Sequence, residues 1–413
     1  MPAKHEQMRN TNALLVLDYI RLNGETTRRS IQQATGLSWA AVSNISTDLI
    51  SKSVLRELPF PGKMAGRNPG YLDFVPMQNL TIGMDLNAEG ITVQLLDLRC
   101  NVVDQIQEAI RSFERDHVIA QMLDAIGKLI RRNDLHPKAI LGIGIATQGS
   151  VDKAGAMSLF NSSFHDWRDV PLKDICEKRF GIPVHVMHDP VCIALAEQWQ
   201  RKLNENNDFA MVRLSYGIGM SYVANGMPIT GCDGIAGEMG HMVLDPNGPR
   251  CSCGNRGCME SYCSIRGLSY RIVEAHHNGT ISLPEELREI NDRNVLSMRS
   301  VVSWAAGQAR NGNVILRAMF DDAGYFLGVG IANVVSLFNP EYVILTGEML
   351  EFEDLVLEKA KETASETVWS LSKYEVVLSH GGKHQAAMGA ALYFINQAFN
   401  SLESRLLEQT VIA

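Results

Sequence analysis

The sequence lacks any apolar run that approaches the roughly 18 residues needed to cross a membrane. It also lacks a secretory signal, because the residues after Met1 are polar where such a signal has an apolar segment. Charged residues make up 20% and apolar residues 46% of the 413 positions, which are ordinary proportions for a globular protein with two or three domains. We therefore expect a cytoplasmic protein that does not insert into a membrane.

Cysteine is also scarce, with eight residues that are not spaced like a disulfide framework. Three of them, Cys251, Cys253 and Cys258, follow His241 in the order H-x9-C-x-C-x4-C. Glycines after the second of these cysteines and before the third let the backbone turn tightly around one ion. This Cys3His set predicts structural Zn2+. The alternative is three cysteines that pack as small hydrophobic residues beside an unrelated histidine.

Two carboxylates, Glu238 and Glu260, bracket these ligands in the sequence. A loop tied to a metal would hold both carboxylates near one place, and paired carboxylates are suited to binding the hydroxyls of a sugar. Alternatively, the two residues form a solvated surface or orient the histidine.

The charge of the chain is unevenly distributed. Residues 1–70 contain nine Lys and Arg against five Asp and Glu, a net charge of +4. The whole chain has a net charge of −8, so the remainder has −12. A basic N-terminal segment on an acidic body indicates a DNA-binding module joined to a part that binds small molecules.

Three short helices are predicted in that basic segment: one over residues 12–22, one over 28–35, and a third that follows Ser38 and has Val42, Ile45 and Leu49 on its apolar face. Thr27 and Ser38 are suited to cap the second and third, and Gly36 ends the second. Two strands at residues 54–58 and 71–75 would form a wing, so the segment predicts a winged helix-turn-helix. The alternative is a small helical module that binds protein.

Residues that would bind double-stranded DNA fall into three groups. The third helix presents small or hydrogen-bonding side chains to base edges, Arg28 and Arg29 face phosphates, and Arg67 in the wing can enter a minor groove. The predicted contacts on the third helix are Trp39, Ala40, Ser43, Asn44 and Thr47.

From residue 80 onwards, strands and helices alternate in two successive blocks, a pattern typical of two α/β lobes around a cleft. We predict a winged helix-turn-helix at residues 1–76, a first lobe at 77–198 and a second lobe at 199–385. The C-terminal helix, 386–413, is expected to return to the first lobe.

The motifs described above resemble those of the ROK family, which contains repressors, open reading frames and sugar kinases. The match includes the E-x-G-H sequence at Glu238 to His241, the cysteine block, and a G-R-x-P segment at Gly66 to Pro69 that is similar to the family's repressors. The resemblance implies a two-lobed actin-like ATPase (ribonuclease H-like) fold. It also implies a sugar site formed by Asn161, Asp189, Glu238, His241 and Glu260.

Asp189 matches the general base of the family's kinases; the alternative, which does not exclude that role, is a cap of the helix that follows it. Asn161 could likewise cap a turn. The kinase phosphate loop D-x-G-G-T-K is lost after Asp85, where an acidic Glu89 stands in the loop. In the second loop Tyr216 replaces a threonine, and Glu348 replaces a glycine on the adenosine side. We therefore expect neither ATP binding nor enzyme activity.

The sequence thus predicts a transcriptional regulator, most simply a repressor of carbohydrate uptake or catabolism genes. Its partners would be a double-stranded DNA operator, a sugar or sugar phosphate, and a second copy in a homodimer or homotetramer. Two alternatives stay open: a sugar kinase with a DNA-binding head, and a repressor controlled by a sugar-transport phosphotransferase protein. The effector, the operator and the sign of regulation are not defined by the sequence.

Overall fold

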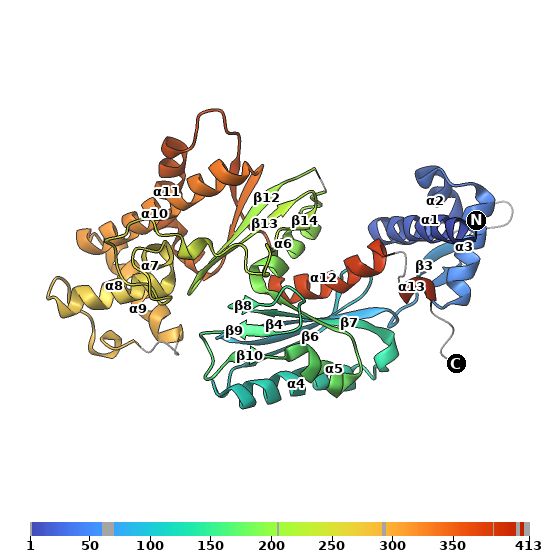
Figure 1. The fold of residues 1–413 in the computed structure, drawn as a ribbon, viewed down its shortest axis with the longest axis horizontal. Coiled ribbons are helices and arrows are strands. Elements are labelled where there is room, and N and C mark those ends of the chain that lie inside the picture. The colour runs from blue at the N-terminus through green and yellow to red at the C-terminus, as the bar shows by residue number, and fades with distance from the viewer. Residues whose placement is uncertain are drawn as a thin grey trace.

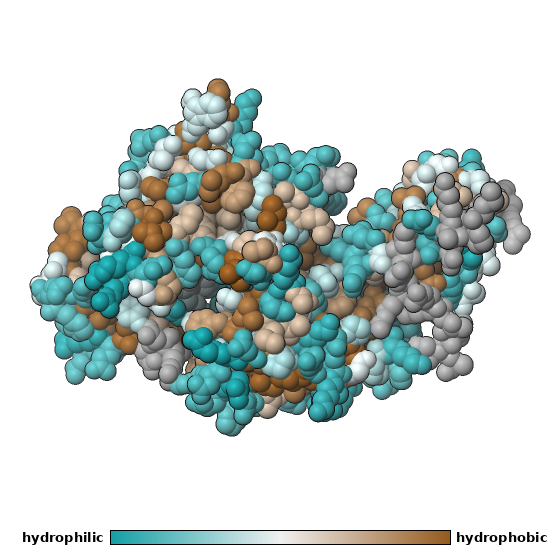
Figure 2. Space-filling model, in the orientation of Figure 1, coloured by the Kyte–Doolittle hydropathy of each residue, from teal (hydrophilic) through white to brown (hydrophobic). Residues whose placement is uncertain are grey.

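The computed structural model describes residues 2–59, 70–204, 206–290, 295–382, 384–401 and 405–408. Figure 1 shows a small N-terminal unit at one end of an elongated molecule, beside a body that contains two large β-sheets. On the face drawn in Figure 2, hydrophilic residues are spread over the whole surface with hydrophobic residues between them. Within the described ranges, no helix is both long and apolar enough for a membrane span.

The N-terminal unit is a helix-turn-helix with a small sheet. Its elements are α1 (Pro2–Asn23), β1 (Thr26–Thr27), α2 (Arg28–Thr35), α3 (Trp39–Ser51), β2 (Leu55–Leu58) and β3 (Tyr71–Phe74). The side chains of Thr27 and Ser38 accept hydrogen bonds at the first turns of α2 and α3, which confirms both predicted caps. Gly36 follows α2 in the left-handed conformation (φ 71°), which glycine adopts without strain. β2 and β3 pair antiparallel, as expected for the wing.

The first lobe of the body is a five-stranded sheet in the order β11-β7-β4-β5-β6. Its elements are β4 (Leu80–Leu86), β5 (Gly90–Leu96), β6 (Val102–Ala109), α4 (Arg115–Arg132), η1 (Pro137–Ala139), β7 (Ile140–Thr147), α5 (Leu172–Phe180), β11 (Val184–His188) and α6 (Asp189–Gln200). A small sheet adjoins it, formed by β8 (Ser150–Val151), β9 (Ser158–Phe160) and β10 (Arg168–Val170). Helices cover both faces of the large sheet (Figure 1), so β7 is buried along its whole length and is apolar throughout.

The second lobe has a sheet in the order β14-β13-β12-β15-β16 and a group of helices on one side of it (Figure 1). Its strands are β12 (Phe209–Leu214), β13 (Ile218–Ala224), β14 (Met227–Pro228), β15 (Tyr342–Thr346) and β16 (Glu375–Leu378). Its helices are η2 (Met239–His241), α7 (Glu260–Cys263), α8 (Ile265–His277), η3 (Glu285–Leu287), α9 (Val295–Arg310), α10 (Val314–Phe338), η4 (Glu348–Phe352) and α11 (Glu353–Thr367). β12 pairs antiparallel with β13 and parallel with β15, which repeats the pairing of β4 with β5 and β7.

The chain then returns to the first lobe through α12 (Gln385–Asn400), and α13 (Arg405–Glu408) follows it. At two strand positions α12 lies so close to the first-lobe sheet that a side chain would not fit. A Cβ atom at Gly83 of β4 would lie 1.8 Å from the Ala387 carbonyl oxygen, and one at Gly144 of β7 would lie 1.9 Å from that of Ala390. Glycine at these two strand positions therefore allows the helix to approach the sheet.

The C-terminal end of α12 packs against the N-terminal unit. The Phe399 ring meets the Phe74 ring of β3 edge to face, with centroids 6.5 Å apart. The guanidinium carbon of Arg21 in α1 lies 4.3 Å from the centre of the Phe399 ring and 4.8 Å from that of Trp199 in α6. Arg99, in the loop after β5, forms a 2.6 Å ion pair with Asp73 of β3. The N-terminal unit is therefore attached to both α12 and the first-lobe sheet.

Gly144→Ala should destabilise the protein by at least about 2 kcal/mol, because the added methyl group overlaps the backbone of α12. Gly307→Ala is the matched control. Gly307 lies inside α9, and nothing lies within 4 Å of an added Cβ atom there, so alanine should stabilise the helix by about 0.5–1 kcal/mol. Chemical denaturation of both variants measures these changes. An equal effect of the two substitutions would contradict the close packing described for α12.

Candidate functional site and metal centre

The predicted metal ligands come together in the second lobe. His241 ends η2, and Cys251, Cys253 and Cys258 lie on the loop that leads to α7. Their ligand atoms all lie within 4.8 Å of one another, with the Cys253 and Cys258 sulfurs 3.7 Å apart and the Cys251 sulfur 3.6 Å from His241 Nδ1. Ligands placed tetrahedrally about 2.3 Å from an ion are separated by roughly these distances. This cluster could therefore hold a metal ion.

The loop needs glycine to reach this geometry. Gly257, directly before the last cysteine, has a φ of 66°, and a Cβ atom there would lie 1.5 Å from the Asp245 carbonyl oxygen. Gly254, directly after the second cysteine, has a φ of 96°. Because residues with a side chain rarely adopt these angles, the two glycines singled out in the sequence are required by the backbone.

A cavity of about 240 Å³ lies next to the cluster, between the two lobes. Four of the five residues predicted to bind a sugar line it: Asp189, Glu238, His241 and Glu260. Burial raises the pKa of Glu238, and the neighbouring Glu260 adds to this effect while His241 opposes it. The cavity thus brings carboxylates from both lobes into one polar space, an arrangement that can accept hydrogen bonds from several hydroxyl groups.

Glu260 is the most constrained of these carboxylates. It begins α7 and is buried, and its Oε2 accepts a 3.0 Å hydrogen bond from the backbone N–H of Ile218. Its Oε1 accepts a 3.2 Å hydrogen bond from Ser252, which lies between two of the cysteines. Glu260 therefore connects the metal loop to the first residue of β13.

Asn161, the fifth predicted sugar ligand, lies behind the cavity wall. It is 1% exposed, and its Oδ1 accepts a 2.9 Å hydrogen bond from the backbone N–H of Ser163. Ser162 and Ser163 themselves line the cavity. The geometry corresponds to the turn-capping alternative for Asn161, and its direct contact with a sugar stays a prediction.

Asp189 has a partner that the sequence did not indicate. It is the first residue of α6, and Arg213 of β12 forms an ion pair with it across the cleft. His188 Nε2 lies 3.4 Å from Asp189 Oδ1. Burial, assisted by Arg213, lowers the pKa of His188 to about 4, so this histidine is neutral at pH 7. Arg213 is the one charged residue in the apolar strand β12, which is the signal that could have revealed it.

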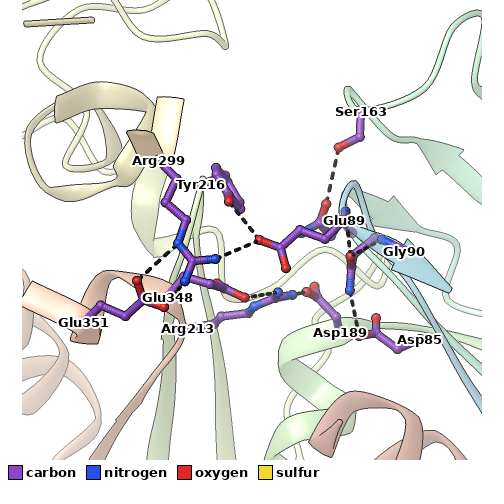
Figure 3. Close-up of polar contacts among 12 residues, drawn as sticks. Asp85, Glu89, Gly90, Ser163, Asp189, Arg213, Tyr216, Arg299, Glu348 and Glu351 are labelled. Carbon is purple, nitrogen blue, oxygen red and sulfur yellow. Dashed lines mark hydrogen bonds and ion pairs between the residues drawn. The ribbon is translucent and has the colours of Figure 1, made fainter. Parts of the chain in front are cut away.

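A second group of contacts crosses the same cleft (Figure 3). Glu89, from the turn between β4 and β5, accepts a 2.8 Å hydrogen bond from the Tyr216 hydroxyl and lies 3.8 Å from Arg299 of α9. Arg299 also pairs with Glu351, and Arg213 lies 3.7 Å from Glu348. Each of Glu89, Tyr216 and Glu348 differs from the residue at the same place in the loops of the family's kinases. In this structure they belong to networks of charged and hydroxyl groups that join the lobes.

The predicted DNA-binding face of α3 is open. Trp39, Ala40, Asn44 and Thr47 are exposed and Ser43 is half-buried, whereas the opposite side of the helix lies in the apolar core of the unit.

The arginines predicted to contact DNA differ in their surroundings. Arg29 is exposed, but Arg28 forms two hydrogen bonds with the Glu57 carboxylate, of 2.8 and 3.1 Å, so a phosphate would have to compete for it. Arg67 lies outside the described residues.

Known proteins of one family are similar to this chain. A model of the ROK family matches residues 81–397. The xylose repressor of Bacillus subtilis is 27% identical over 391 residues, which are 94% of this chain and 96% of the repressor. The glucokinase of Thermotoga maritima is 28% identical over 313 residues, which are 75% of this chain and 95% of the kinase.

Among solved structures, a ROK family transcriptional regulator described as a homologue of the Escherichia coli Mlc protein has a TM-score of 0.76 and 22% identity. The match covers 98% of this chain and all of that one. This likeness confirms the predicted fold, a two-lobed actin-like body preceded by a winged helix-turn-helix.

Asp85→Asn should stabilise the protein at neutral pH and have less effect in acid. Burial raises the pKa of Asp85 from 3.8 to about 6, so ionising this carboxyl opposes folding increasingly as the pH rises from about 4 to about 7. At the upper end of this range, the full change in the free energy of unfolding is about 3 kcal/mol.

Thermal unfolding between pH 4.5 and 7.5 measures this effect. The Tm of the variant should rise relative to the parent with increasing pH. Asp116→Asn, at an exposed carboxylate, controls for the loss of one negative charge. A Tm difference that stays constant over this range would exclude a raised pKa at Asp85.

Proposed function

Because this chain belongs to the ROK family, we propose that it is a sugar-responsive transcriptional repressor that controls genes of carbohydrate uptake or catabolism. One observation supports this most directly: the same chain carries an exposed polar helix in a winged helix-turn-helix and a cavity with carboxylates from two lobes. Its similarity to the xylose repressor extends over nearly the whole of both chains. The effector would be a sugar or a sugar derivative bound by Asp189, Glu238, His241 and Glu260.

The proposal excludes sugar phosphorylation as the function. A kinase needs a free base at the sugar hydroxyl and a cradle for the phosphates of ATP. Here Arg213 pairs with Asp189, the residue at the position of the kinase base. Glu89 projects toward Tyr216 and Arg299 from the turn that corresponds to the first phosphate loop. A carboxylate at this place would repel a triphosphate.

Control of DNA binding requires that the sugar binds one arrangement of the lobes more tightly than another. The contacts of Arg213 with Asp189 and of Glu89 with Arg299 both cross the cleft, so a sugar that changes either contact alters the energy of lobe closure. In a homodimer or homotetramer, two heads would bind two half-sites about 34 Å apart, or a multiple of that distance. A small change of lobe angle would then change the match to the operator.

The central experiment combines DNA binding with a sugar panel. The purified full-length protein should bind fragments from promoters of neighbouring carbohydrate genes, and one sugar of the panel should release it. A coupled ATP-consumption assay with the same sugars should show no turnover. Turnover that is abolished by Asp189→Asn, together with no affinity for any promoter fragment, would overturn the proposal. Release by a phosphotransferase protein without sugar would support the predicted alternative mode of control.

Asn44→Ala should weaken binding to the specific operator by about 5- to 100-fold and leave binding to unrelated DNA unchanged, because an exposed amide on α3 reads base edges. Arg29→Ala should weaken binding to both DNAs and reduce the salt dependence by about one ion, as expected for a phosphate contact. Fluorescence anisotropy at several salt concentrations distinguishes the two effects. Asn311→Ala, at an exposed site in the body, is the control. Equal losses on both DNAs for Asn44→Ala would refute base recognition by this residue.

We further propose that the ion at His241, Cys251, Cys253 and Cys258 is zinc, which would cross-link the loop that carries Ser252 and leads to Glu260. Thiolate and imidazole ligands in a tetrahedral set favour this metal. Such a cross-link would hold Glu260 in the cavity even when no sugar is bound.

Cys253→Ala should reduce the metal content well below one zinc per chain and lower the Tm by about 5 °C or more, since structural zinc contributes several kcal/mol to folding. It should also weaken the sugar response. Cys232→Ala is the matched control, because Cys232 is an exposed cysteine outside the cluster. Elemental analysis and thermal unfolding are the two measurements. A Cys253→Ala protein with full metal content and an unchanged Tm would contradict this assignment.

A further inference from the structure

A second cavity, of about 750 Å³, adjoins the cavity assigned to the sugar. Four residues line both cavities: Ser162, Ser252, Glu260 and Arg266. The two spaces therefore meet at the Glu260 carboxylate, and a ligand held by Glu260 in the smaller space can extend into the larger one. The larger cavity lies on the side of the metal loop that faces α8, which contributes Arg266, Gly267, Tyr270, Arg271 and Glu274 to its wall.

This second cavity is rich in arginine. Its walls contain four guanidinium groups, from Arg250, Arg256, Arg266 and Arg271, against the two carboxylates of Glu260 and Glu274. Four positive charges and two negative ones leave a net charge of +2 on the lining, although the whole chain has −8. A concave, positively charged surface in an acidic protein attracts anions selectively.

Two of these arginines have N–H groups that no described residue satisfies. Nε of Arg266 and Nη1 of Arg271 are buried and have no hydrogen-bond partner within the described ranges. The other terminal nitrogen of Arg271 pairs with Asp322 at 2.7 Å, and its guanidinium group lies over the Tyr262 ring, so this arginine is held in place from two sides. Buried guanidinium donors without a partner are costly, and an anion with several oxygens would satisfy them.

Resting on the proposed function, we propose that the effector is an anionic sugar, with a phosphate or carboxylate group bound by Arg266 and Arg271 while Glu260 holds its hydroxyls. Glu260 opposes this binding electrostatically, so the anion lies away from Glu260 and beside Arg266 and Arg271. Glu274 of α8 also opposes it. A neutral sugar occupies only the smaller cavity, which Arg271 does not line, and leaves the buried Nη1 donor of Arg271 without a partner. The protein therefore distinguishes a phosphorylated or oxidised sugar from its neutral parent.

The test is calorimetric titration of the full-length, metal-loaded protein with matched sets of ligands. Each set contains a neutral aldose (xylose, glucose, galactose, mannose or N-acetylglucosamine), its phosphate esters and, where one exists, the corresponding uronic acid. Inorganic phosphate alone is the control for an isolated ion. At least one anionic sugar should bind ten times more tightly than its neutral parent, and the phosphate and carboxylate arms identify which anion is used.

Two substitutions with opposite expected effects on affinity test whether this preference depends on the larger cavity. Arg271→Gln should weaken binding of the anionic sugar at least tenfold, whereas Glu274→Gln, at an exposed position, should strengthen it about two- to fivefold. Neither residue lines the smaller cavity, so binding of the neutral parent should change less than twofold. Arg317→Gln, at a half-buried arginine of α10 that lines neither cavity, should change neither affinity.

Three results would overturn the inference. In the first, a neutral aldose binds the protein and releases it from DNA at least as well as every anionic counterpart does. The repressor function then stands, and only the anionic effector is wrong. In the second, Arg271→Gln and Glu274→Gln change neutral and anionic sugars equally. In the third, no sugar of either kind binds, a result that also contradicts the proposed sugar control.

Discussion

The close contact between α12 and the first-lobe sheet determines how the parts of this molecule are joined. Gly83 and Gly144 let the helix lie against the strands backbone to backbone, and Gly389 does the same on the side facing α6, where a Cβ atom would lie 1.6 Å from the Cys192 carbonyl oxygen. Because an interior packed this tightly has no space to absorb a shift, α12, α6 and the sheet move together. The N-terminal unit is attached to the far end of this block through Phe399.

The cleft between the lobes shows how a set of substitutions can be mutually consistent. Tyr216 and Glu89 come from loops that bind phosphates in a kinase, and here they form a hydrogen bond with each other. Glu348 lies beside Arg213, which pairs with the carboxylate at the position of the kinase base. Tyr216 is buried, so without Glu89 its hydroxyl would lose this hydrogen bond, which costs free energy. Arg213 likewise gives Asp189 and Glu348 a partner of opposite charge.

Local features of the structure followed from the sequence, whereas contacts between distant residues did not. The caps at Thr27 and Ser38, the apolar strand β7 and the Cys3His cluster depend on residues close in the sequence or on a short motif with its own glycines. The partners of Asp189 and Glu89 lie 24 and more than 100 residues away, and no periodicity marks them. For the same reason the pairing of Arg28 with Glu57 was not foreseen.

The two ends of α6 connect the cavity to the DNA-binding unit. Asp189 begins this helix inside the cavity and pairs with the second lobe through Arg213. Trp199, near its other end, lies against Arg21 of α1, and Arg21 also covers Phe399 of α12. A sugar that competes with Arg213 for Asp189 therefore acts on a rigid helix whose opposite end touches the DNA-binding unit. Since α6 spans 12 residues, about 18 Å at 1.5 Å per residue, one helix covers the distance between the two sites without an intervening loop.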